Sequence, residues 1–224
     1  REEHHLFRTA LRDFLQREVV PYIDDWESEG QIPRSIWSKF GNMGFLGTTI
    51  APKYGGSGLD FPYQVILTEE TSKINSGGFS AAVVGHDALA MVYLNKFGST
   101  RLKEQFLPAS CMGQSFGCLA VTEPHAGSDV ASIRTSAKKT AQGYVINGSK
   151  TFITNGVLSD YLIVAAKTDL DQQSAGISLF LLNRTIPGIQ ASALNKLGWK
   201  ASDTAELSFQ DVFIPHEHLI GEEN

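Results

Sequence analysis

The residues best suited to bind a ligand lie in one stretch, Ala120–Ser132, with the sequence Ala-Val-Thr-Glu-Pro-His-Ala-Gly-Ser-Asp-Val-Ala-Ser. Pro124 withdraws one backbone N–H and restricts Glu123 to an extended or turn geometry. Gly127 permits a positive φ or a close backbone approach, and Ser128 adds a hydroxyl. Successive N–H groups in such a bend form a concavity that suits an anion, often phosphate. The stretch therefore predicts a bend that ends a buried strand and holds a phosphate-bearing ligand.

A second stretch, Thr151-Phe-Ile-Thr-Asn-Gly156, supplies a flat aromatic ring at Phe152 and a hydroxyl at Thr154. An aromatic ring offers a face on which a planar ligand can stack, and a hydroxyl both donates and accepts hydrogen bonds. Together with the bend, these residues predict a planar cofactor that carries phosphate, as a flavin does.

No carboxylate in the sequence is assigned as a catalytic base. Glu69 and Glu70 end a predicted helix, and we interpret both as part of its solvated face. Glu123 lies in the bend, where we expect it to fix the loop through backbone hydrogen bonds rather than to abstract a proton.

Other patterns have structural explanations that we favour over chemical ones. His216 and His218 have strand-like spacing, but no cysteine or carboxylate completes a metal site, so no metal is expected. His86-Asp87 lies on an apolar helix and is interpreted as a hydrogen-bonded core pair rather than a catalytic dyad. Gly55–Gly58 lacks the preceding strand and the βαβ unit of a dinucleotide-binding fingerprint.

Small residues recur on the helix predicted for residues 78–97, at Ala81, Ala82, Gly85 and Ala88. They either leave room for a fatty tail or allow close helix packing, and the second explanation is somewhat favoured.

Composition narrows the class of protein. The 224 residues suffice for one large domain or two small ones. The net charge of −5 and the dispersed cations argue against a nucleic-acid partner, and Lys138-Lys139 is interpreted as a solvated hairpin face. Cys111 and Cys118 are too few for a disulfide framework and indicate a reducing compartment. No segment is expected to span a membrane. Because the chain begins at Arg1, we interpret its start as trimmed, with any targeting segment lost.

The elements that position these residues change character along the chain. Apolar spacing and Pro, Gly and hydroxyl boundaries predict helices over residues 1–20, 33–44, 62–70, 78–97 and 100–109. Alternation then predicts strands over residues 115–122, 134–139, 144–146, 161–166, 177–182, 189–194 and 206–214. Asn147-Gly148 is typical of a two-residue hairpin turn of type I′. The sequence thus predicts an α+β protein in which a helical domain, residues 1–113, precedes an antiparallel β-barrel or sandwich, residues 114–224.

Several stretches resemble one protein family. Ala120–Ser132 resembles the signature of the acyl-CoA dehydrogenase family, in which a small residue, an aliphatic residue, Thr or Ser, and Glu precede Gly-Ser-Asp. In family order, Ala51–Asp60 resembles the loop of the N-terminal helical domain, Asn147–Gly156 the second flavin-contacting segment, and Gly198–Val212 the end of the middle β-domain. The run from Thr204 to Asn224 is most similar to the long-chain members.

The resemblance implies FAD as the cofactor and gives four residues specific roles. Thr122 would hydrogen-bond the pyrimidine edge of the flavin, and Ser128 would contact the FAD pyrophosphate close to the acyl-CoA. Phe152 would cover one face of the isoalloxazine ring, and Thr154 would hydrogen-bond near its reactive nitrogen.

The resemblance also implies that the bend as a whole contacts FAD and that a later turn touches the CoA moiety. The implied cofactor-binding residues are Leu119, Ala120, Val121, Thr122, Glu123, Pro124, His125, Ala126, Gly127, Ser128, Phe152, Ile153 and Thr154. The implied substrate-binding residues are Ser128, Ser174 and Ala175. His125 often corresponds to glycine in the family and removes backbone freedom. Phe152 often corresponds to tryptophan and keeps a ring face without the indole N–H.

The activity that the resemblance implies is FAD-dependent dehydrogenation of a fatty acyl-CoA to the trans-2-enoyl product, as in fatty acid β-oxidation. Electrons would pass to an electron-transferring flavoprotein. The family's base is a glutamate of a C-terminal helical domain, so no catalytic residue is expected before Asn224, and the isolated chain is expected to be inactive and to bind FAD poorly. The alternatives are an acyl-CoA oxidase and a non-catalytic binding module. A homo-oligomer, tetramer or dimer, in the bacterial cytoplasm or mitochondrial matrix is implied.

Overall fold

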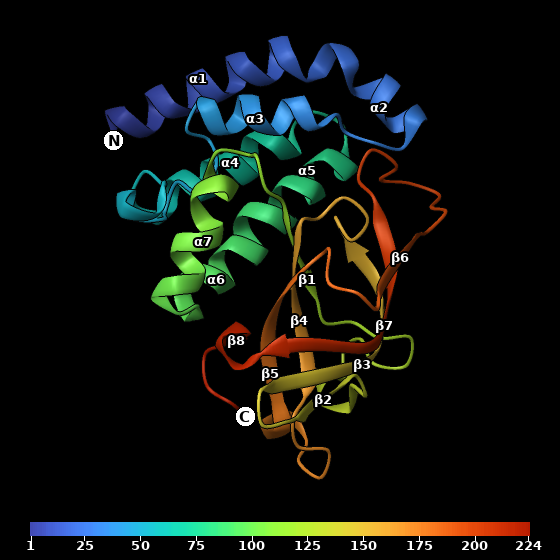
Figure 1. Ribbon diagram of the computed structural model, residues 1–224. Helices are drawn as coiled ribbons and strands as arrows, with labels where there is room; N and C mark the ends of the chain where they lie inside the picture. The colour runs from blue at the N-terminus through green and yellow to red at the C-terminus, as the bar shows by residue number, and fades with distance from the viewer.

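The computed structural model describes residues 1–224, in which a layer of helices precedes a curled β-sheet (Figure 1). The helices are α1 (Glu2–Glu18), α2 (Ile23–Glu29), α3 (Arg34–Asn42), α4 (Phe61–Ser72), α5 (Gly77–Val84), α6 (Met91–Phe97) and α7 (Thr100–Cys111). The strands are β1 (Gly117–Ala120), β2 (Ser136–Lys139), β3 (Gly143–Thr154), β4 (Tyr161–Lys167), β5 (Ile177–Asn183), β6 (Ile189–Ala193), β7 (Thr204–Pro215) and β8 (Leu219–Ile220). The predicted fold class is confirmed, whereas the division at residue 113, between α7 and β1, stays a prediction.

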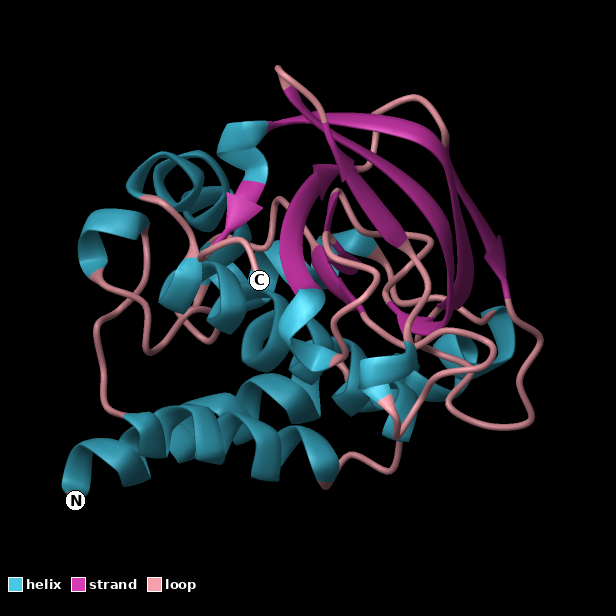
Figure 2. Ribbon diagram, turned by 90° about the horizontal axis from the view of Figure 1, so that it is seen from below, coloured by secondary structure: helices cyan, strands magenta, loops and turns pink.

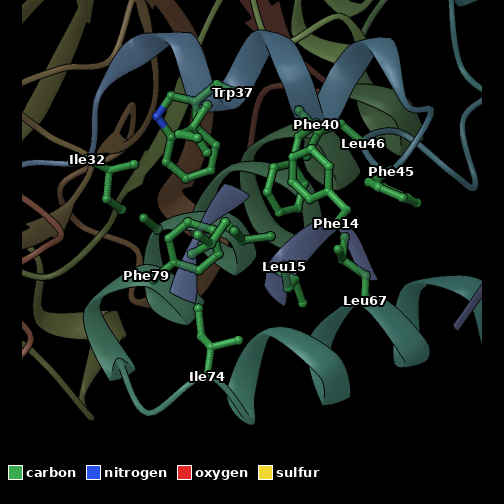
Figure 3. Packing of buried hydrophobic residues seen from close by; sticks show 14 of the residues in the cluster. Phe14, Leu15, Ile32, Trp37, Phe40, Phe45, Leu46, Leu67, Ile74 and Phe79 are labelled. Carbon is green, nitrogen blue, oxygen red and sulfur yellow. The ribbon is translucent and has the colours of Figure 1, made fainter. Parts of the chain in front are cut away.

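Aromatic side chains form the centre of the helical layer (Figure 3). α1 buries Phe14 and Leu15 on the apolar stripe that its sequence predicts. Phe14 meets Phe40 of α3 edge to face, with ring centroids 4.8 Å apart, and Trp37 stacks on Phe79 of α5 at 5.9 Å. Each buried aromatic side chain contributes on the order of 2–3 kcal/mol, so these contacts fix the helices against one another.

One continuous helix, Gly77–Phe97, runs from the helical layer toward the sheet. It consists of α5, a π-helical turn over Gly85–Ala90, and α6. By length and composition this helix is apolar enough to cross a membrane, which corrects the expectation that no segment is. Within the fold, 56% of its most apolar stretch is buried, as in the core helix of a globular domain.

The eight strands form one curled sheet around its own interior, with the order β6-β7-β3-β2-β4-β5-β8 and β1 beside β4 (Figure 2). Most pairs are antiparallel as predicted, but β4 pairs in parallel with both β1 and β2. β4 is buried on both faces: Leu162 and Val164 point into the interior, whereas Tyr161 and Ile163 pack against the helices. The unbroken apolar run of β4 follows from this double burial.

The expected hairpin at Asn147-Gly148 is wrong. Both residues lie inside β3, where the register against β7 shifts between Ile146 and Gly148. The Asn147 side chain exchanges hydrogen bonds of 3.1 and 2.9 Å with Asp211 of β7, whose φ is 49°. Long-range pairing with β7 therefore turns a local hairpin signal into a β-bulge.

The interpretation of Glu70 as part of a solvated face is also wrong. Its side chain is only 2% exposed and accepts hydrogen bonds from Arg8 at 2.6 Å, Arg12 at 2.9 Å and Lys73 at 2.8 Å. Glu69 is exposed and pairs with Arg8 at the rim. The cluster joins α1 to α4 through charge-assisted bonds.

His86 and Asp87 are buried and hydrogen-bonded as predicted, but not to each other. His86 bridges the Ser110 carbonyl at 3.3 Å and the Gly117 N–H at 3.1 Å. Asp87 accepts the Gly47 N–H at 2.7 Å. Burial lowers the pKa of His86 to about 4, so its ring is neutral and fixes the start of β1 against the helices.

Candidate functional site

The bend that follows β1 is closed by its own backbone. The Glu123 N–H donates to the Ala126 carbonyl at 2.9 Å, and the Ala126 N–H returns a bond to Glu123 at 3.1 Å. Pro124 and His125, at the tip, are exposed. The predicted bend at the end of a buried strand is confirmed.

A buried ion pair fixes the bend to β3. The Lys150 ammonium is fully buried and donates to the Glu123 carboxylate at 2.7 Å and to the Val121 carbonyl at 2.9 Å. The same carboxylate accepts the N–H groups of Arg134 at 2.6 Å and Thr135 at 2.9 Å. Burial acts to raise the pKa of Glu123, but these bonds outweigh it and hold the pKa below its ordinary value. Glu123 therefore fixes its loop, as the sequence predicts.

The bend and β3 also meet through their backbones. The Thr151 N–H donates to the Thr122 carbonyl at 2.9 Å, which brings Thr122 beside the segment that carries Phe152. The register of β3 against β7 shifts between Lys150 and Ile153, and Phe152 adopts a φ of 57° with 69% of its surface exposed. A bulky residue with positive φ is a strained outlier, and such strain is concentrated at ligand sites.

The sequence suggests two uses for Gly127, a positive φ or a close backbone approach. Its φ is not positive, so the bend does not use that freedom. A Cβ added at Gly127 would meet no atom within 4 Å, so nothing inside the chain requires glycine there. The open backbone at Gly127, next to the exposed Ser128, leaves space for a ligand to approach closely.

The turn that carries Ser174 and Ala175 lies beside the end of this bend. Both residues are exposed on the short 3₁₀ turn Ser174–Gly176, which packs against the turn Val130–Ser132. The turn therefore lies beside a segment that begins two residues after Ser128, and a shared role of these residues in substrate binding stays a prediction.

Not every residue named from sequence can present its side chain to a ligand. Ala120, Ala126 and Ile153 are buried in apolar clusters, and Leu119 packs against the helix-facing side of the sheet. These four residues can offer only backbone groups.

A groove of about 410 Å³ opens where β3 meets the continuous helix. Thr154 lines it from β3, and the helix supplies small and apolar side chains. Its lining is Ser72, Gly77, Ser80, Ala81, Val84, Gly85, Leu89, Thr154 and Trp199, none of them charged. The two explanations of the small residues therefore apply to different positions. Ala81 lines the groove. Ala82 is buried in the helix packing, and its carbonyl accepts a hydrogen bond from the Asn155 side-chain amide at 2.9 Å.

Gly85 both leaves room in the groove and allows close packing. It lines the groove, and a Cβ there would lie 3.2 Å from the Asn155 amide and 3.4 Å from Thr154. The absence of a side chain therefore lets β3 approach the helix and leaves the groove open beside Thr154.

Sequence reasoning missed Lys150 and Trp199. Lys150 has the same alternation parity along β3 as Tyr144 and Ile146, whose side chains are buried. A lysine at a buried strand position indicates a buried counter-charge. That signal was hidden by the supposed hairpin at Asn147-Gly148. No local signal marks Trp199, which reaches the groove from a loop.

His216 and His218, considered above as a metal pair, make structural contacts. The His218 ring bonds the Leu181 carbonyl at 2.7 Å, and His216 meets Tyr144 edge to face. Lys138 and Lys139 are exposed on β2, as expected.

Comparison with known proteins identifies the family. Residues 1–114 match the acyl-CoA dehydrogenase N-terminal domain, and residues 118–212 match its middle domain. The chain is 44% identical over 225 residues to the long-chain specific acyl-CoA dehydrogenase, mitochondrial, of Rattus norvegicus, covering 99% of this chain and 52% of that protein.

Solved structures agree. The crystal structure of an acyl-CoA dehydrogenase from Geobacillus kaustophilus superposes with a TM-score of 0.95 at 43% identity, covering 100% of this chain and 59% of that one. A glutaryl-CoA dehydrogenase from Mycobacterium smegmatis in complex with FADH2 gives a TM-score of 0.92 at 30% identity, covering 99% and 56%. The chain spans about half the length of the curated relatives it matches. It belongs to the acyl-CoA dehydrogenase family.

Proposed function

We propose that the protein oxidises a fatty acyl-CoA to its trans-2-enoyl-CoA with FAD as cofactor. One observation supports this proposal: the Thr122 carbonyl accepts the Thr151 N–H next to Phe152, and Thr154, farther along β3, opens onto an uncharged groove. A planar cofactor and an alkyl chain can therefore lie side by side at this edge of the sheet.

The residues present fit FAD. Phe152 exposes a ring on a strained backbone, and Gly127 leaves the bend open to close approach. Thr122 and Thr154 are half-buried, and no hydrogen bond within the chain occupies either hydroxyl. We infer that Phe152 stacks on the isoalloxazine ring, that both threonines bond its polar edge, and that Ser128 and backbone N–H groups from Leu119 to Ser128 hold the pyrophosphate region.

When bound, FAD supplies a two-electron acceptor for the hydride that leaves the acyl chain. This chain's residues orient the reactants. Apolar contacts along Ala81 and Val84 hold the alkyl part, and the turn at Ser174 and Ala175 binds the CoA part with Ser128. A site that positions reacting atoms within near-attack distance contributes a large share of the rate.

The base that removes the α proton lies outside the groove described here. No carboxylate lines the groove, and the carboxylate of Glu123 is engaged by Lys150 and two backbone N–H groups. We infer, from the family resemblance, that a glutamate beyond these 224 residues supplies the base.

The acceptor and setting are inferred from the same resemblance. We propose that electrons pass to an electron-transferring flavoprotein, and that the whole protein is a homo-oligomer, a tetramer or a dimer, in the bacterial cytoplasm or the mitochondrial matrix. An acyl-CoA oxidase would use the same bend and groove but let oxygen reach the reduced flavin, and a binding module would keep them without turnover.

Product analysis tests the proposal. The FAD-loaded full-length protein is incubated with a saturated fatty acyl-CoA and an artificial electron acceptor without oxygen, and the CoA ester is examined by mass spectrometry. We expect a product two hydrogens lighter, with the double bond between C2 and C3. Unchanged ester would exclude the enzyme and favour the binding module, and hydrogen peroxide formed in air at the same rate would identify an oxidase.

A further inference from the structure

Trp199 is the one tryptophan that the fold does not bury. It lies in the loop between β6 and β7, has a φ of 57°, and is 61% exposed, whereas Trp26 and Trp37 are 6% and 4% exposed. A large residue held at positive φ yet left exposed carries both a backbone strain and a solvation cost. Such a combination points to a role outside the packing of the chain.

The backbone of Trp199 is held firmly from both sides. The Lys196 ammonium donates to the Trp199 carbonyl at 2.7 Å and to the Ser202 carbonyl at 2.6 Å. The next two N–H groups, of Lys200 and Ala201, donate to the Glu27 carboxylate of α2 at 2.8 and 3.1 Å. The loop therefore spans from the sheet to the helical layer and is fixed at both (Figure 1).

The indole rests on the first turn of α5. A Cβ added at Gly77 would lie 2.3 Å from the indole nitrogen, and one at Gly78 would lie 2.9 Å from the Trp199 carbonyl. Only glycine allows the ring to lie this close to the helix. The contact places the indole at one end of the stretch of helix that lines the groove, because Gly77 is the first helix residue in its lining.

Thr154 lines the groove farther along the helix. It packs against Gly85, eight residues farther along the helix than Gly77. At 1.5 Å per residue the two contacts are about 12 Å apart along the helix. An extended alkyl chain advances about 1.25 Å per carbon, because its 1.5 Å bonds meet at tetrahedral angles, so about ten carbons fit between them.

We propose that Trp199 forms the end wall of the acyl groove and sets the longest chain that gains binding energy there. This inference rests on the proposed function, which places the reacting carbons beside Thr154. A chain of about twelve carbons then reaches the indole, and carbons beyond it pass into solvent. Ala81 and Val84 line the groove between these two contacts and do not set its length.

Binding of unreactive ligands tests the wall. S-alkyl thioethers of CoA lack the carbonyl and are not oxidised, so calorimetric titration of the FAD-loaded full-length protein with chains of 4 to 18 carbons measures affinity alone. Each buried methylene strengthens binding about fourfold, since it contributes about 0.8 kcal/mol. We expect the increase in affinity with chain length to stop near twelve carbons in the wild type. In Trp199→Ala this break in the dependence on chain length should come at least two carbons later.

Matched variants separate the wall from the loop. Leu197→Ala removes an apolar side chain that is fully exposed in the same loop and absent from the groove, so it should leave the break unchanged. Trp199→Phe keeps an aromatic wall and should move the break by no more than one carbon.

Indole fluorescence gives a second readout that does not depend on turnover. Trp26 and Trp37 are buried, and the difference between the emission of wild type and that of Trp199→Phe isolates the response of Trp199 from that of every other tryptophan in the full-length protein. We expect a blue shift of its emission with chains of twelve carbons or more, none with chains of eight or fewer, and no shift in Trp199→Phe.

The outcomes distinguish the two proposals. If affinity rises with chain length but breaks at the same length in wild type and Trp199→Ala, the proposed function stands and the wall is wrong. If no thioether binds, or affinity does not depend on chain length, the acyl-CoA function fails and the wall fails with it.

Discussion

At the scale of single residues, the Glu123–Lys150 pair links the two segments of the candidate site. Lys150 is fully buried, and its ammonium joins the carboxylate of Glu123 to the Val121 carbonyl. A buried ion pair adds little stability by itself, but removing one partner leaves the other charge uncompensated. We infer that the pair maintains the position of the bend relative to Phe152.

Lys150→Met should therefore be strongly destabilising. The variant leaves the Glu123 carboxylate buried with only its backbone donors, and we expect the free energy of unfolding in urea to fall by about 3 kcal/mol. Lys138→Met, at an exposed position on the neighbouring β2, should change it by less than about 0.5 kcal/mol. Equal effects of the two substitutions would show that the buried pair does not hold the bend.

Thr154→Val tests the hydroxyl at the junction of cofactor and groove. In the full-length protein, loss of one hydrogen bond to a flavin in a dry site should cost on the order of 1–3 kcal/mol. We expect this loss to appear as a shift of the flavin midpoint potential and as slower reduction of the flavin by substrate. Thr68→Val makes the same chemical change on the exposed face of α4 and serves as the control. An unchanged potential and rate in Thr154→Val would exclude the assigned hydrogen bond.

At the scale of elements, the Glu70 cluster fixes α1 to α4. Hydrogen bonds from Arg12, Lys73 and Arg8 outweigh burial and lower the pKa of Glu70 to about 2. A carboxyl whose folded pKa lies below its unfolded value of 4.5 adds stability that is complete above pH 4.5 and is lost as the pH falls to about 2.

Glu70→Gln should remove this pH dependence. Because Arg12 and Lys73 are more than half exposed, solvent screening leaves about 2 kcal/mol of stabilisation that wild type loses between pH 5 and 2. Urea unfolding at a series of pH values measures it. Glu69→Gln, whose side chain is half exposed, should retain the wild-type profile. A Glu70→Gln profile as steep as that of wild type would contradict this role.

Local patterns predicted most of the elements. Helical spacing identified α1, α3, α4, α7 and the continuous helix. Alternation identified β1 to β7, although only residues 144–146 of β3, and it missed the two-residue β8. The seven-residue α2 was missed because it has only two buried residues, Ile23 and Trp26, which are too few to reveal a helical period. The bulge at Asn147 was misread because its partner Asp211 lies 64 residues away.

The candidate site was predictable where it rests on residue type. Glycine, proline and hydroxyls predicted the bend, and the roles that the resemblance implies for Thr122, Phe152 and Thr154 stay predictions. The buried charges were not predictable, because Glu70 and Lys150 find their partners 58 and 27 residues away in sequence. The positive φ of Phe152 and of Trp199 follows from sheet register and loop contacts, which no short window contains.

At the scale of the whole molecule, the groove exists only because two layers meet. α5 supplies its small residues, β3 supplies Thr154, and the loop after β6 supplies Trp199. His86 holds the start of β1 against the helices, so the layers cannot shift without moving the bend. The expectation that these 224 residues alone bind FAD poorly stays a prediction.

Anaerobic titration of the FAD-loaded full-length protein with acyl-CoAs of several chain lengths tests the central claim most directly. The flavin absorbance reports electron transfer from the acyl chain, with no added acceptor. We expect bleaching by fatty acyl-CoAs, strongest with chains long enough to fill the groove. Flavin that stays oxidised with every acyl-CoA, although FAD is bound, would contradict dehydrogenation and leave a binding module or another substrate.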